Sequence, residues 1–385
     1  MATDPSIRFV MSMFARHYTE AALIMPERFA KREFGFMFFD RDFVMRHLAF
    51  PTRSALKKYL VEQVPAHAYY SCAYYETPDA PTMVEKKWQG ADLIFDLDAD
   101  HVEGAKSLPY EKMLERVKEE VKRLIDEFLL GDLGFTEDDL KIVFSGGRGY
   151  HVHIREIAVR GWGSQERREL IDYVCGIGID PGVLLSGSPG GTPGWRERYI
   201  STISEYLLWL KGLGQEEGGK HLMELPGIDR KKAYRFVGAI DAHLEGLGKG
   251  DFAPLLADPV FSGLLGQEGG KFQELLRGRA ALADEPVTTD TRRLIRLPTS
   301  LHGGSGLRVT PVPLGDLETF DPLQDAVVFS DRRVKVETGA NIAMEILGNR
   351  YQVAKGMSAV PEALAVFLCA RGLAEVAGEG VHAPR

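Results

Sequence analysis

Cysteine is scarce in this chain of 385 residues. The three cysteines, Cys72, Cys175 and Cys369, are widely spaced and form no Cys-x-x-Cys pair. An odd number of cysteines at such spacings excludes a disulfide framework and a thiolate zinc site. The composition therefore indicates a reduced, intracellular protein.

Long apolar runs are also missing. No segment reaches the roughly 18 uncharged apolar residues that a membrane helix requires. Asp4, Arg8 and Arg16 interrupt the N-terminal segment, where a signal peptide would have an unbroken apolar core. We therefore expect a cytoplasmic protein that does not associate with membranes.

The chain has no excess of positive charge, because 47 lysines and arginines face 55 aspartates and glutamates, for a net charge of −8. A protein that depends on non-specific nucleic-acid binding usually carries the opposite sign. Any nucleic-acid function must therefore use a local basic surface, or metal ions that neutralise acidic side chains. What is present, 44% hydrophobic and 26% charged residues, is typical of a globular protein of one large or two ordinary domains.

Strand-like and helix-like segments alternate along the chain. Aromatic-rich runs at 32–39 and 43–50 flank an Asp-Arg-Asp turn, and residues 140–144 and 150–156 flank a glycine-rich turn, so both pairs predict hairpins. Apolar residues three and four positions apart predict a helix over 110–130. Hairpins mixed with helices favour an α+β sheet over a doubly wound parallel one.

The middle of the chain has a different character. A Gly- and Pro-rich loop at 182–194 marks a candidate boundary. Beyond it, Thr202 and Glu205 form a capping-box pattern for a helix that reaches Leu210, and further helices are predicted over 229–240 and 271–282. We therefore predict an all-helical insertion at 195–280 within a core formed by 1–194 and 281–385. Strands should resume near Pro286, because RLIRLP and LRVTPVPL are again strand-like.

The clearest strand, 91–98, carries an Asp-x-Asp pair. Residues two apart on a strand share a face, so Asp96 and Asp98 direct their carboxylates to one side. Neighbouring carboxylates repel each other near a core unless a cation lies between them. Oxygen ligands without cysteine suit Mg²⁺ or Mn²⁺. A solvated strand end is the alternative, because Asp-x-Asp alone is a weak signal.

A second motif, SGGRGYH, spans 145–151. Its glycines would let backbone amides approach an anion, and Arg148 offers a fork suited to phosphate oxygens. The motif is neither a Walker A loop nor a Rossmann fingerprint. Because His151 and His153 share a strand face, a His-x-His metal site and ordinary packed histidines are both alternatives. A glycine-rich hairpin with a solvated arginine is another, but the pattern favours an anion-binding loop.

A third motif gathers carboxylates, three arginines and a histidine between Asp284 and His302. Arg292 and Arg296 would share a face if this segment is a strand. Either Asp284 or Asp290 could join the Asp-x-Asp pair, and spacing alone leaves both open.

Together, FDLDAD, SGGRGYH and DEPVTTD followed by RLIRLPTSLHG resemble the small catalytic subunit of the archaeal and eukaryotic type of DNA primase. KREFGF near the N-terminus and Arg46 also look like this family, and the resemblance covers at least residues 30–310. It implies a primase-type mixed-sheet catalytic core. It also implies that three carboxylates are catalytic and hold the metal ions, namely Asp96, Asp98 and Asp284. The residues that it assigns to the phosphates of the incoming nucleotide are Ser145, Arg148, His151, Arg296 and His302.

The resemblance implies template-directed synthesis of short RNA or mixed RNA/DNA primers on single-stranded DNA. A 3′-hydroxyl would attack the α-phosphate of a nucleoside triphosphate or deoxynucleoside triphosphate, with two Mg²⁺ or Mn²⁺ ions, and pyrophosphate would leave. A large iron–sulfur regulatory subunit would be the partner in a heterodimer, in the nucleoid region of an archaeal cell. Candidate template-binding segments are Lys31–Arg32, Arg292–Arg293 and Arg332–Lys335.

This chain departs from the family pattern at two places. Many relatives have a cysteine-rich zinc knuckle shortly after the Asp-x-Asp strand, where this chain has HVEGAKSLPYEK, so we expect no structural zinc. Many relatives also have a lysine two residues after the turn histidine, where this chain has Gly304.

Two other activities are open. A repair polymerase of the primase–polymerase group could share these motifs and would extend primers but initiate poorly. A metal-dependent phosphohydrolase, built on the carboxylates with His151 and His153, would release phosphate instead of pyrophosphate.

Overall fold

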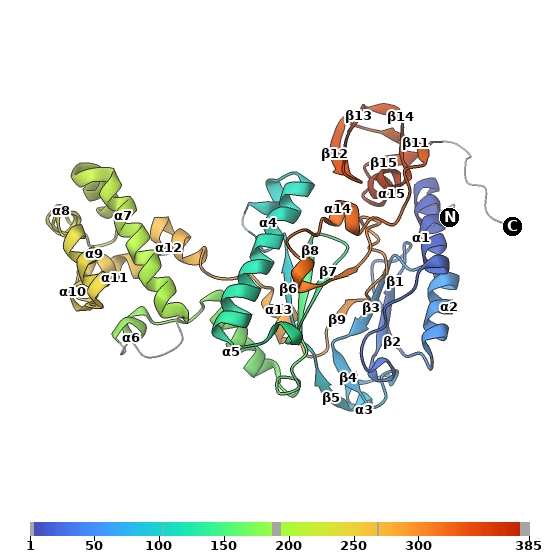
Figure 1. The fold of residues 1–385 in the computed structure, drawn as a ribbon, viewed down its shortest axis with the longest axis horizontal. Helices are drawn as coiled ribbons and strands as arrows, with labels where there is room; N and C mark the ends of the chain where they lie inside the picture. Colours follow the sequence, from blue (N-terminus) through green and yellow to red (C-terminus); the bar gives the residue numbers. More distant parts are fainter. Residues whose placement is uncertain (1–3, 103, 187–193, 268, 378–385) are drawn as a thin grey trace. The chain divides into compact units, whose positions relative to one another are not determined.

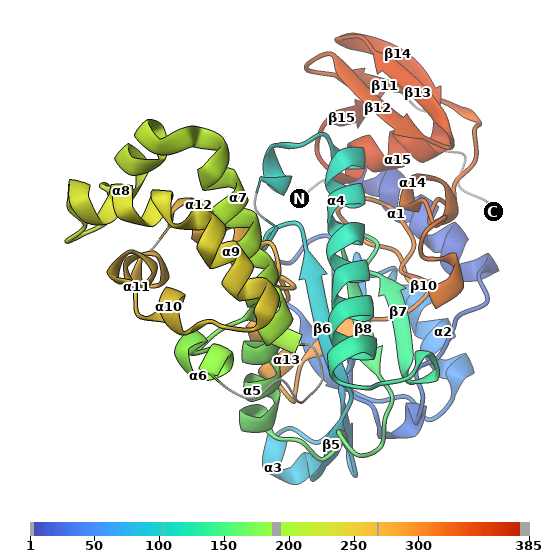
Figure 2. The same ribbon diagram turned by 60° about the vertical axis from the view of Figure 1, so that its left-hand side comes forward.

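The structure is a computed structural model that describes residues 4–102, 104–186, 194–267 and 269–377. The chain divides into two compact units (Figures 1 and 2). The first, here called the core unit, comprises residues 1–122, 135–169 and 283–385, and the second, the helical unit, comprises 123–134 and 170–282. The domain ranges predicted from the sequence, a core of 1–194 and 281–385 with an insertion at 195–280, stay a prediction. Within the described ranges, no helix is both long enough and apolar enough to cross a membrane.

The core unit contains a four-stranded antiparallel sheet built from distant parts of the chain. Across the sheet the strands are β2 (Met45–Leu48), β1 (Phe34–Met37), β3 (His67–Ser71) and β9 (Leu294–Arg296). The predicted hairpin of β1 and β2 is confirmed. Helices α1 (Pro5–Glu20) and α2 (Arg53–Gln63) lie beside this sheet (Figure 1). Aromatic rings join them to it, with Phe14 5.4 Å from Phe39 and Tyr59 4.7 Å from Phe36 between ring centroids.

A second four-stranded antiparallel sheet carries the first two motifs. Across it the strands are β10 (Thr310–Val312), β7 (Leu140–Phe144), β8 (Gly149–Ile154) and β6 (Leu93–Asp98). The predicted hairpin of β7 and β8 is confirmed. Leu93, Phe95 and Leu97 of β6 are fully buried. This anchoring turns the alternate face of β6 outward, and the register places Asp96 opposite His151 and Asp98 opposite Gly149.

Helix α4 (Tyr110–Arg123) lies along the second sheet (Figures 1 and 2). Its apolar stripe, which includes Met113, Val117 and Val121, is buried. The helix predicted over 110–130 is confirmed in position, but its last part, η3 (Leu124–Asp132), is a π-helix. The apolar stripe therefore predicted the buried face of the helix but not its change from an α-helix to a π-helix.

The remaining described elements of the core unit are shorter. β4 (Ala73–Tyr75) pairs with β5 (Trp88–Ala91), and α3 (Met83–Lys86) lies between them in the chain. Near the C-terminus, β14 (Gly356–Pro361), β11 (Arg333–Thr338) and β15 (Ala374–Val376) form one sheet, and β12 (Ile342–Ile346) pairs with β13 (Asn349–Val353). Helix α15 (Glu362–Ala370) is buried along nearly all of its length. The mixture of helices and antiparallel sheets confirms the α+β class.

The described part of the helical unit contains helices and no strands. Its main helices are α7 (Gly194–Leu222), α8 (Arg230–Gly238), α9 (Ile240–Lys249), α11 (Pro259–Gly266) and α12 (Gly270–Arg277). Buried apolar side chains such as Leu210, Phe236 and Phe272 form its interior. The helix predicted over 229–240 is confirmed as α8, which Asp229 caps, and the helix predicted over 271–282 is confirmed as α12 but ends five residues earlier, at Arg277.

Three local predictions differ from the structure in whole or in part. The capping box at Thr202 does not begin a helix, because α7 starts at Gly194 and Thr202 is fully buried within it. Strands do resume after Pro286, as β9 in RLIRLP and β10 in LRVTPVPL, but the residues at Pro286 itself form a short helix, α13 (Glu285–Thr289). Pro286 occupies a first-turn position of this helix, which tolerates proline. The loop predicted at 182–194 begins with helix α6 (Pro181–Ser186), and its residues 187–193 lie outside the described residues.

Candidate active site

A cavity of about 410 Å³ in the core unit gathers polar side chains from both four-stranded sheets. Seven of the eight predicted site residues line it, and Asp284 is the one that does not. The full lining is Asp96, Asp98, Tyr110, Ser145, Gly147, Arg148, His151, Arg296, His302, Gly304, Ser305 and Arg371. Residues from three separate motifs therefore meet at one place.

The carboxylates lie at one edge of this cavity. Asp96 and Asp98 project from β6, and the backbone N–H of Asp284 donates a hydrogen bond to the carbonyl oxygen of Asp96 at 2.9 Å. Asp284 is the N-cap of α13, which begins directly after it. This helix start, and not the predicted strand entrance, is what brings Asp284 beside the Asp-x-Asp pair.

The electrostatics of this edge favour a cation. Burial, together with the negative charges of Asp98 and Asp284, raises the pKa of Asp96 to about 7. Neighbouring carboxylates repel each other when all of them are ionised, and a hard divalent ion would neutralise this charge. Among the described residues, however, no three histidine, cysteine, aspartate or glutamate side chains are already close enough together to hold an ion. The fit to a metal therefore rests on charge and ligand type.

The glycine loop between β7 and β8 is shaped by its neighbours. A Cβ atom at Gly147 would lie 2.9 Å from Nε2 of His302, and one at Gly149 would lie 2.3 Å from the carbonyl oxygen of Leu97. Gly146 has a positive φ of 75°, which favours glycine. These glycines therefore make room for His302 and for strand β6. Within the loop, the N–H of Gly147 donates to Oγ of Ser145 at 3.3 Å.

Arg148 lies between the loop and the carboxylates. Its Nη2 atom is 2.6 Å from Oδ2 of Asp100 and 3.3 Å from Oδ1 of Asp98. The side chain is 38% exposed, so its guanidinium remains accessible to a ligand that enters the cavity. Because it forms two ion pairs, Arg148 is not a merely solvated arginine, and its binding of an anion stays a prediction.

His302 is held in one tautomer. Its Nδ1 accepts a hydrogen bond from the N–H of Gly304 at 3.2 Å, so the ring proton is on Nε2, next to Gly147. Burial and the nearby charge of Arg296 hold the pKa of His302 well below its usual value. The ring is therefore a neutral hydrogen-bond donor at the glycine loop.

His67 and Tyr69 of β3 support Arg296. Arg296 Nη1 contacts Nδ1 of His67, and its guanidinium lies 5.0 Å from the centroid of the Tyr69 ring. Burial, followed by the charge of Arg296, lowers the pKa of His67 to about 3. His67 was not predicted from the sequence, because no motif links strand β3 to the site.

His151 and His153 have separate environments. Nε2 of His151 is 3.6 Å from Oδ1 of Asp96, and burial lowers the pKa of His151 to about 3. His153 lines a different, much smaller cavity of about 20 Å³. Although they share a strand face, the two rings do not converge on one point in the cavity, which argues against a His-x-His metal site.

Tyr110, Ser305 and Arg371 line the cavity but were missed from the sequence. The hydroxyl of Tyr110 donates to the carbonyl oxygen of Gly147 and that of Ser305 to the carbonyl oxygen of Gly146, each at 2.5 Å. These bonds hold the glycine loop from outside. Each residue lies in a segment whose local pattern carries no signal of this contact, so only a spatial comparison could have found it.

The remaining predicted residues lie away from the cavity lining. Asp290 is exposed and accepts a hydrogen bond from the backbone N–H of Arg292 at 2.8 Å. The prediction that Arg32 binds template is wrong, because its side chain is 2% exposed and pairs with Asp92 at 2.6 Å. Arg46 is likewise engaged within the protein, where it pairs with Glu33.

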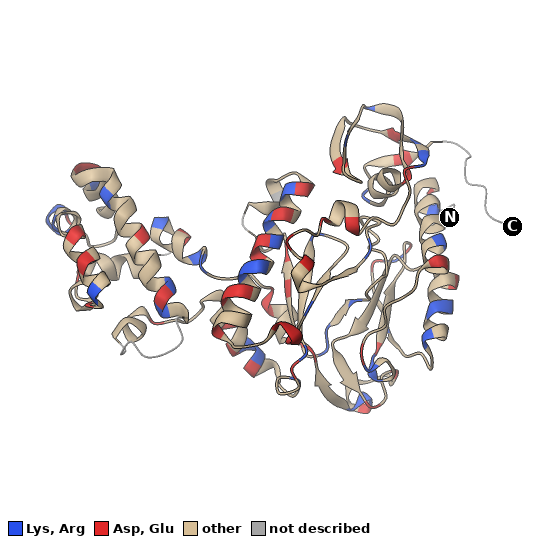
Figure 3. Cartoon of the chain, viewed as in Figure 1, with Lys and Arg blue, Asp and Glu red and all other residues tan. Residues whose placement is uncertain are grey.

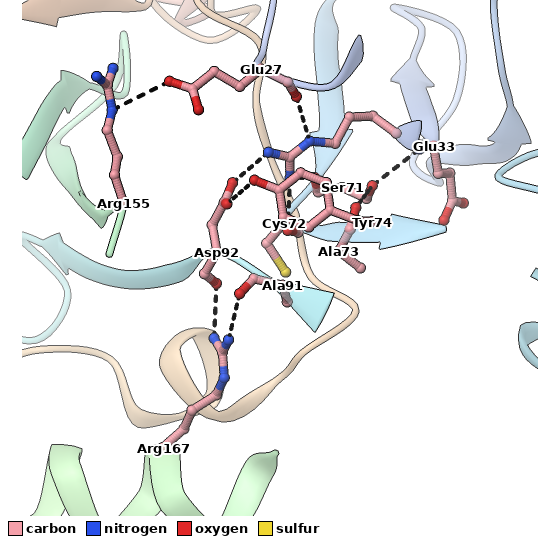
Figure 4. A network of polar contacts seen from close by, with 11 residues as sticks. Glu27, Glu33, Ser71, Cys72, Ala73, Tyr74, Ala91, Asp92, Arg155 and Arg167 are labelled. Carbon is pink, nitrogen blue, oxygen red and sulfur yellow. Dashed lines mark hydrogen bonds and ion pairs between the residues drawn. The ribbon is translucent and has the colours of Figure 1, made fainter. Parts of the chain in front are cut away.

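The Arg32 pairing belongs to a network that fixes the start of β6 (Figure 4). The hydroxyl of Tyr74 contacts the carboxylate of Asp92, and Arg167 donates to the carbonyl oxygens of Ala91 and Asp92 at 2.9 Å each. Arg32 adds bonds to the carbonyl oxygens of Ser71 and Cys72. The network ties β5 to β6 a few residues before the Asp-x-Asp pair, and this positions the two carboxylates.

Comparison with known proteins agrees with this assembly of motifs. The family model described as DNA primase small subunit matches residues 95–314, which contain all eight predicted site residues. The chain is similar to the DNA primase small subunit PriS of Methanoregula boonei, with 52% identity over 96% of this chain and 98% of the relative. The corresponding protein of Methanosphaerula palustris is 47% identical over 97% and 98%, and that of Halorubrum lacusprofundi is 38% identical over 98% and 99%.

Proposed function

The chain belongs to the DNA primase small subunit family, and from this premise we propose that it synthesises short RNA or mixed RNA/DNA primers on single-stranded DNA. The enzyme is a DNA primase, a nucleotidyltransferase of DNA replication. The observation that most directly supports primer synthesis is that one cavity is lined by the two carboxylates of β6 together with Arg148, Arg296 and His302.

Mg²⁺ or Mn²⁺ is the cofactor that we propose, held by Asp96, Asp98 and Asp284. When bound, divalent ions at such a site lower the pKa of the primer 3′-hydroxyl and stabilise the charge of the triphosphate. The raised pKa of Asp96 supports a site that needs a cation. We expect no structural zinc, because residues 101–112 contain no cysteine. Elemental analysis of the chelator-washed chain would measure this directly.

The protein's own part is to position the triphosphate and to compensate its charge. The 3′-hydroxyl of the primer releases its proton to solvent and its oxygen forms a bond to the α-phosphorus, while the bond from that phosphorus to the bridging oxygen breaks and pyrophosphate leaves. Arg148 and Arg296 would compensate the negative charge that develops on the phosphate oxygens. His302 would donate from Nε2 to the same group, and Ser145 would contact it from the glycine loop.

Arg148 also has a part before the nucleotide arrives. Its ion pairs with Asp98 and Asp100 compensate its charge while the cavity holds no triphosphate. A triphosphate offers more negative charge than either carboxylate, so we propose that Arg148 moves from Asp100 to the nucleotide. His151, which is buried and neutral, would keep Asp96 in place through its Nε2.

We propose that the chain works as a heterodimer with a large, iron–sulfur regulatory subunit. The relatives are named small subunits, and this supports the existence of a larger partner subunit. The net charge of −8 also supports one, because it disfavours strong stand-alone binding of a DNA template. Arg293, Arg332 and Arg333 are exposed and would contact the template.

The test is a synthesis assay on poly-pyrimidine single strands with labelled triphosphates and Mg²⁺ or Mn²⁺, with and without the large subunit. We expect short products made without a pre-existing primer, with release of pyrophosphate and no activity in Asp96→Asn. Extension of an annealed primer without initiation would indicate a repair polymerase instead. Phosphate release without polymer would indicate a phosphohydrolase.

A further inference from the structure

We propose that Arg371, at the end of α15, binds the phosphate tail of the incoming nucleoside triphosphate. The inference rests on the proposed function and extends the nucleotide site to a segment outside the three motifs. Arg371 lines the same cavity as Asp96, Arg148 and His302. It lies beyond residue 314, where the match to the family model ends.

The backbone around Arg371 is well anchored. Arg371 is the C-cap of α15, and its N–H donates to the carbonyl oxygen of Phe367 at 3.2 Å. Residues 362–369 of this helix are all buried. An arginine at the end of a buried helix loses little backbone freedom when it binds a ligand, so its position favours a binding role.

The side chain is oriented by aromatic rings. The guanidinium carbon lies 4.9 Å from the centroid of the Tyr110 ring and 5.2 Å from that of Phe367. Such stacking holds the planar group while its N–H donors stay available to an anion. The hydroxyl of Tyr110 in turn donates to Gly147, so Arg371 is linked to the glycine loop through a single residue.

Arg371 differs from the other arginines of the cavity in its charge environment. Arg148 pairs with Asp98 and Asp100, and Arg296 contacts His67 and Tyr69. Among the described residues, no carboxylate lies within ion-pair distance of Arg371. Its positive charge nevertheless reaches the site, since it contributes to the lowered pKa of His302.

These observations select a phosphate ligand. An exposed guanidinium that has no carboxylate partner in the described part of the chain, beside a glycine loop and a neutral histidine donor, matches the bidentate recognition of phosphate oxygens. The link through Tyr110 to Gly147 places Arg371 at the glycine-loop side of the cavity. This is the side that would hold the triphosphate, so we assign Arg371 to the phosphate tail and not to the base or the sugar.

The first test compares Arg371→Ala with Arg350→Ala in primer synthesis. Arg350 is an exposed arginine of β13 that does not line the cavity, and it is the matched control. We expect the KM for nucleoside triphosphate to rise about tenfold or more in Arg371→Ala, with kcat nearly unchanged. Inhibition by inorganic tripolyphosphate should weaken by a similar factor. Arg350→Ala should match the wild-type chain in both measurements.

A rescue experiment shows whether Arg371→Ala acts through the loss of a positive charge or through misfolding. Gly304 lines the cavity and has no side chain, and a Cβ atom there would lie 3.3 Å from Cε1 of His302, so a shift of a few tenths of an ångström admits one. We expect Gly304→Lys to restore part of the nucleotide affinity of Arg371→Ala. Arg371→Lys, which keeps the charge but not the fork, should lie between wild type and Arg371→Ala.

An unchanged KM and unchanged tripolyphosphate inhibition in Arg371→Ala would overturn the assignment, and so would an equal effect of Arg350→Ala. If the wild-type chain makes no primers, the proposed function fails. Calorimetric titration of the full chain with tripolyphosphate still tests Arg371 in that case. Tight binding by wild type that is weakened in Arg371→Ala would support the site, and equal binding by both would reject it.

Discussion

Charged residues occur in both the core unit and the helical unit (Figure 3), but the environments of their side chains differ. In the core unit, buried or half-buried ionisable groups surround a cavity, with Asp96, His151 and Arg296 among them. In the helical unit, most of the described ion pairs include at least one exposed residue, and Lys211 and Asp241 are both exposed. None of the eight predicted site residues lies in the helical unit.

The pKa values follow this difference. Burial and like charges raise the pKa of Asp96 to about 7, and burial lowers that of His151 to about 3. Burying ionisable groups at one place destabilises a fold, so their clustering marks a functional site. The comparison indicates that the buried ionisable groups around the cavity destabilise the fold of the core unit. The described interior of the helical unit is mainly apolar, and the ion pair of Arg198 with Asp132 is buried in it.

The strongest test of the comparison removes one carboxylate of the core unit. We expect Asp284→Asn to reduce synthesis about a thousandfold or more, because a neutral amide replaces a metal-ligand charge poorly. The fold should survive, since the change relieves repulsion with Asp96. Asp290→Asn is the matched control and should keep most activity, because Asp290 is exposed and only caps a turn. An active Asp284→Asn with an inactive, folded Asp290→Asn would reverse the assignment.

The second prediction concerns a buried ion pair of the helical unit. Arg198 Nη1 lies 2.6 Å from Oδ2 of Asp132, and the two side chains are 10% and 6% exposed. Arg198→Leu would leave the Asp132 carboxylate buried without a counter-charge and should reduce stability by about 3 kcal/mol or more in denaturant unfolding.

Measuring primer synthesis by this variant tests whether the helical unit contributes to catalysis. Below the unfolding transition, synthesis per folded Arg198→Leu molecule should equal that of wild type. Lys211→Ala, which removes an exposed pair, should change stability by less than about 1 kcal/mol. A large loss of synthesis in fully folded Arg198→Leu would show that the helical unit takes part in catalysis.

The third prediction returns to the cavity with a smaller effect. Arg148→Ala should raise the KM for nucleoside triphosphate about tenfold or more, because a charge-assisted contact contributes about 1.5–3 kcal/mol. Template binding, measured by fluorescence anisotropy of a labelled single strand, should change little, since the guanidinium faces the cavity beside Asp98. Weakened template binding with an unchanged KM would contradict this role.

The smallest expected effect is a dependence of stability on pH. The pKa values of His67 and His151 are about 3 in the folded chain, so between pH 6.5 and 3 the unfolded chain binds more protons at these groups. Their contribution to stability is therefore present above pH 6.5 and is lost as the pH falls. The raised pKa of Asp96 makes the folded chain bind more protons at this group, and this offsets about as much loss of stability as one of the two histidines contributes.

The net expected loss is at least about 1.4 kcal/mol per pH unit between pH 6 and 5, measured by denaturant unfolding in the presence of a chelator. Asp96→Asn removes the opposing group, so its loss should be steeper by a similar amount. A stability that is flat over this range, or that rises as the pH falls, would show that these histidines are not held neutral.

Local patterns were sufficient for much of the catalytic sheet. Strand alternation placed Asp96 and Asp98 on one face, and the glycine-rich turn predicted the β7–β8 hairpin. Both rest on short-range geometry, because side chains alternate with a period of two and tight turns need glycine. The same reasoning failed at Thr202, where a capping pattern lies inside a helix, because burial in a packed interior overrides a weak local preference.

By itself, the sequence determined the α+β class, the two hairpins and the residue types of the site. Only the tertiary structure decided that β9 pairs with β3, which brings Arg296 toward carboxylates almost 200 positions earlier in the chain. It also decided that Arg32 is buried, that Asp284 starts a helix beside Asp96, and that Arg371 enters the cavity. The reason is physical: a strand's face follows from its own residues, but its partner depends on which distant surfaces bury each other best.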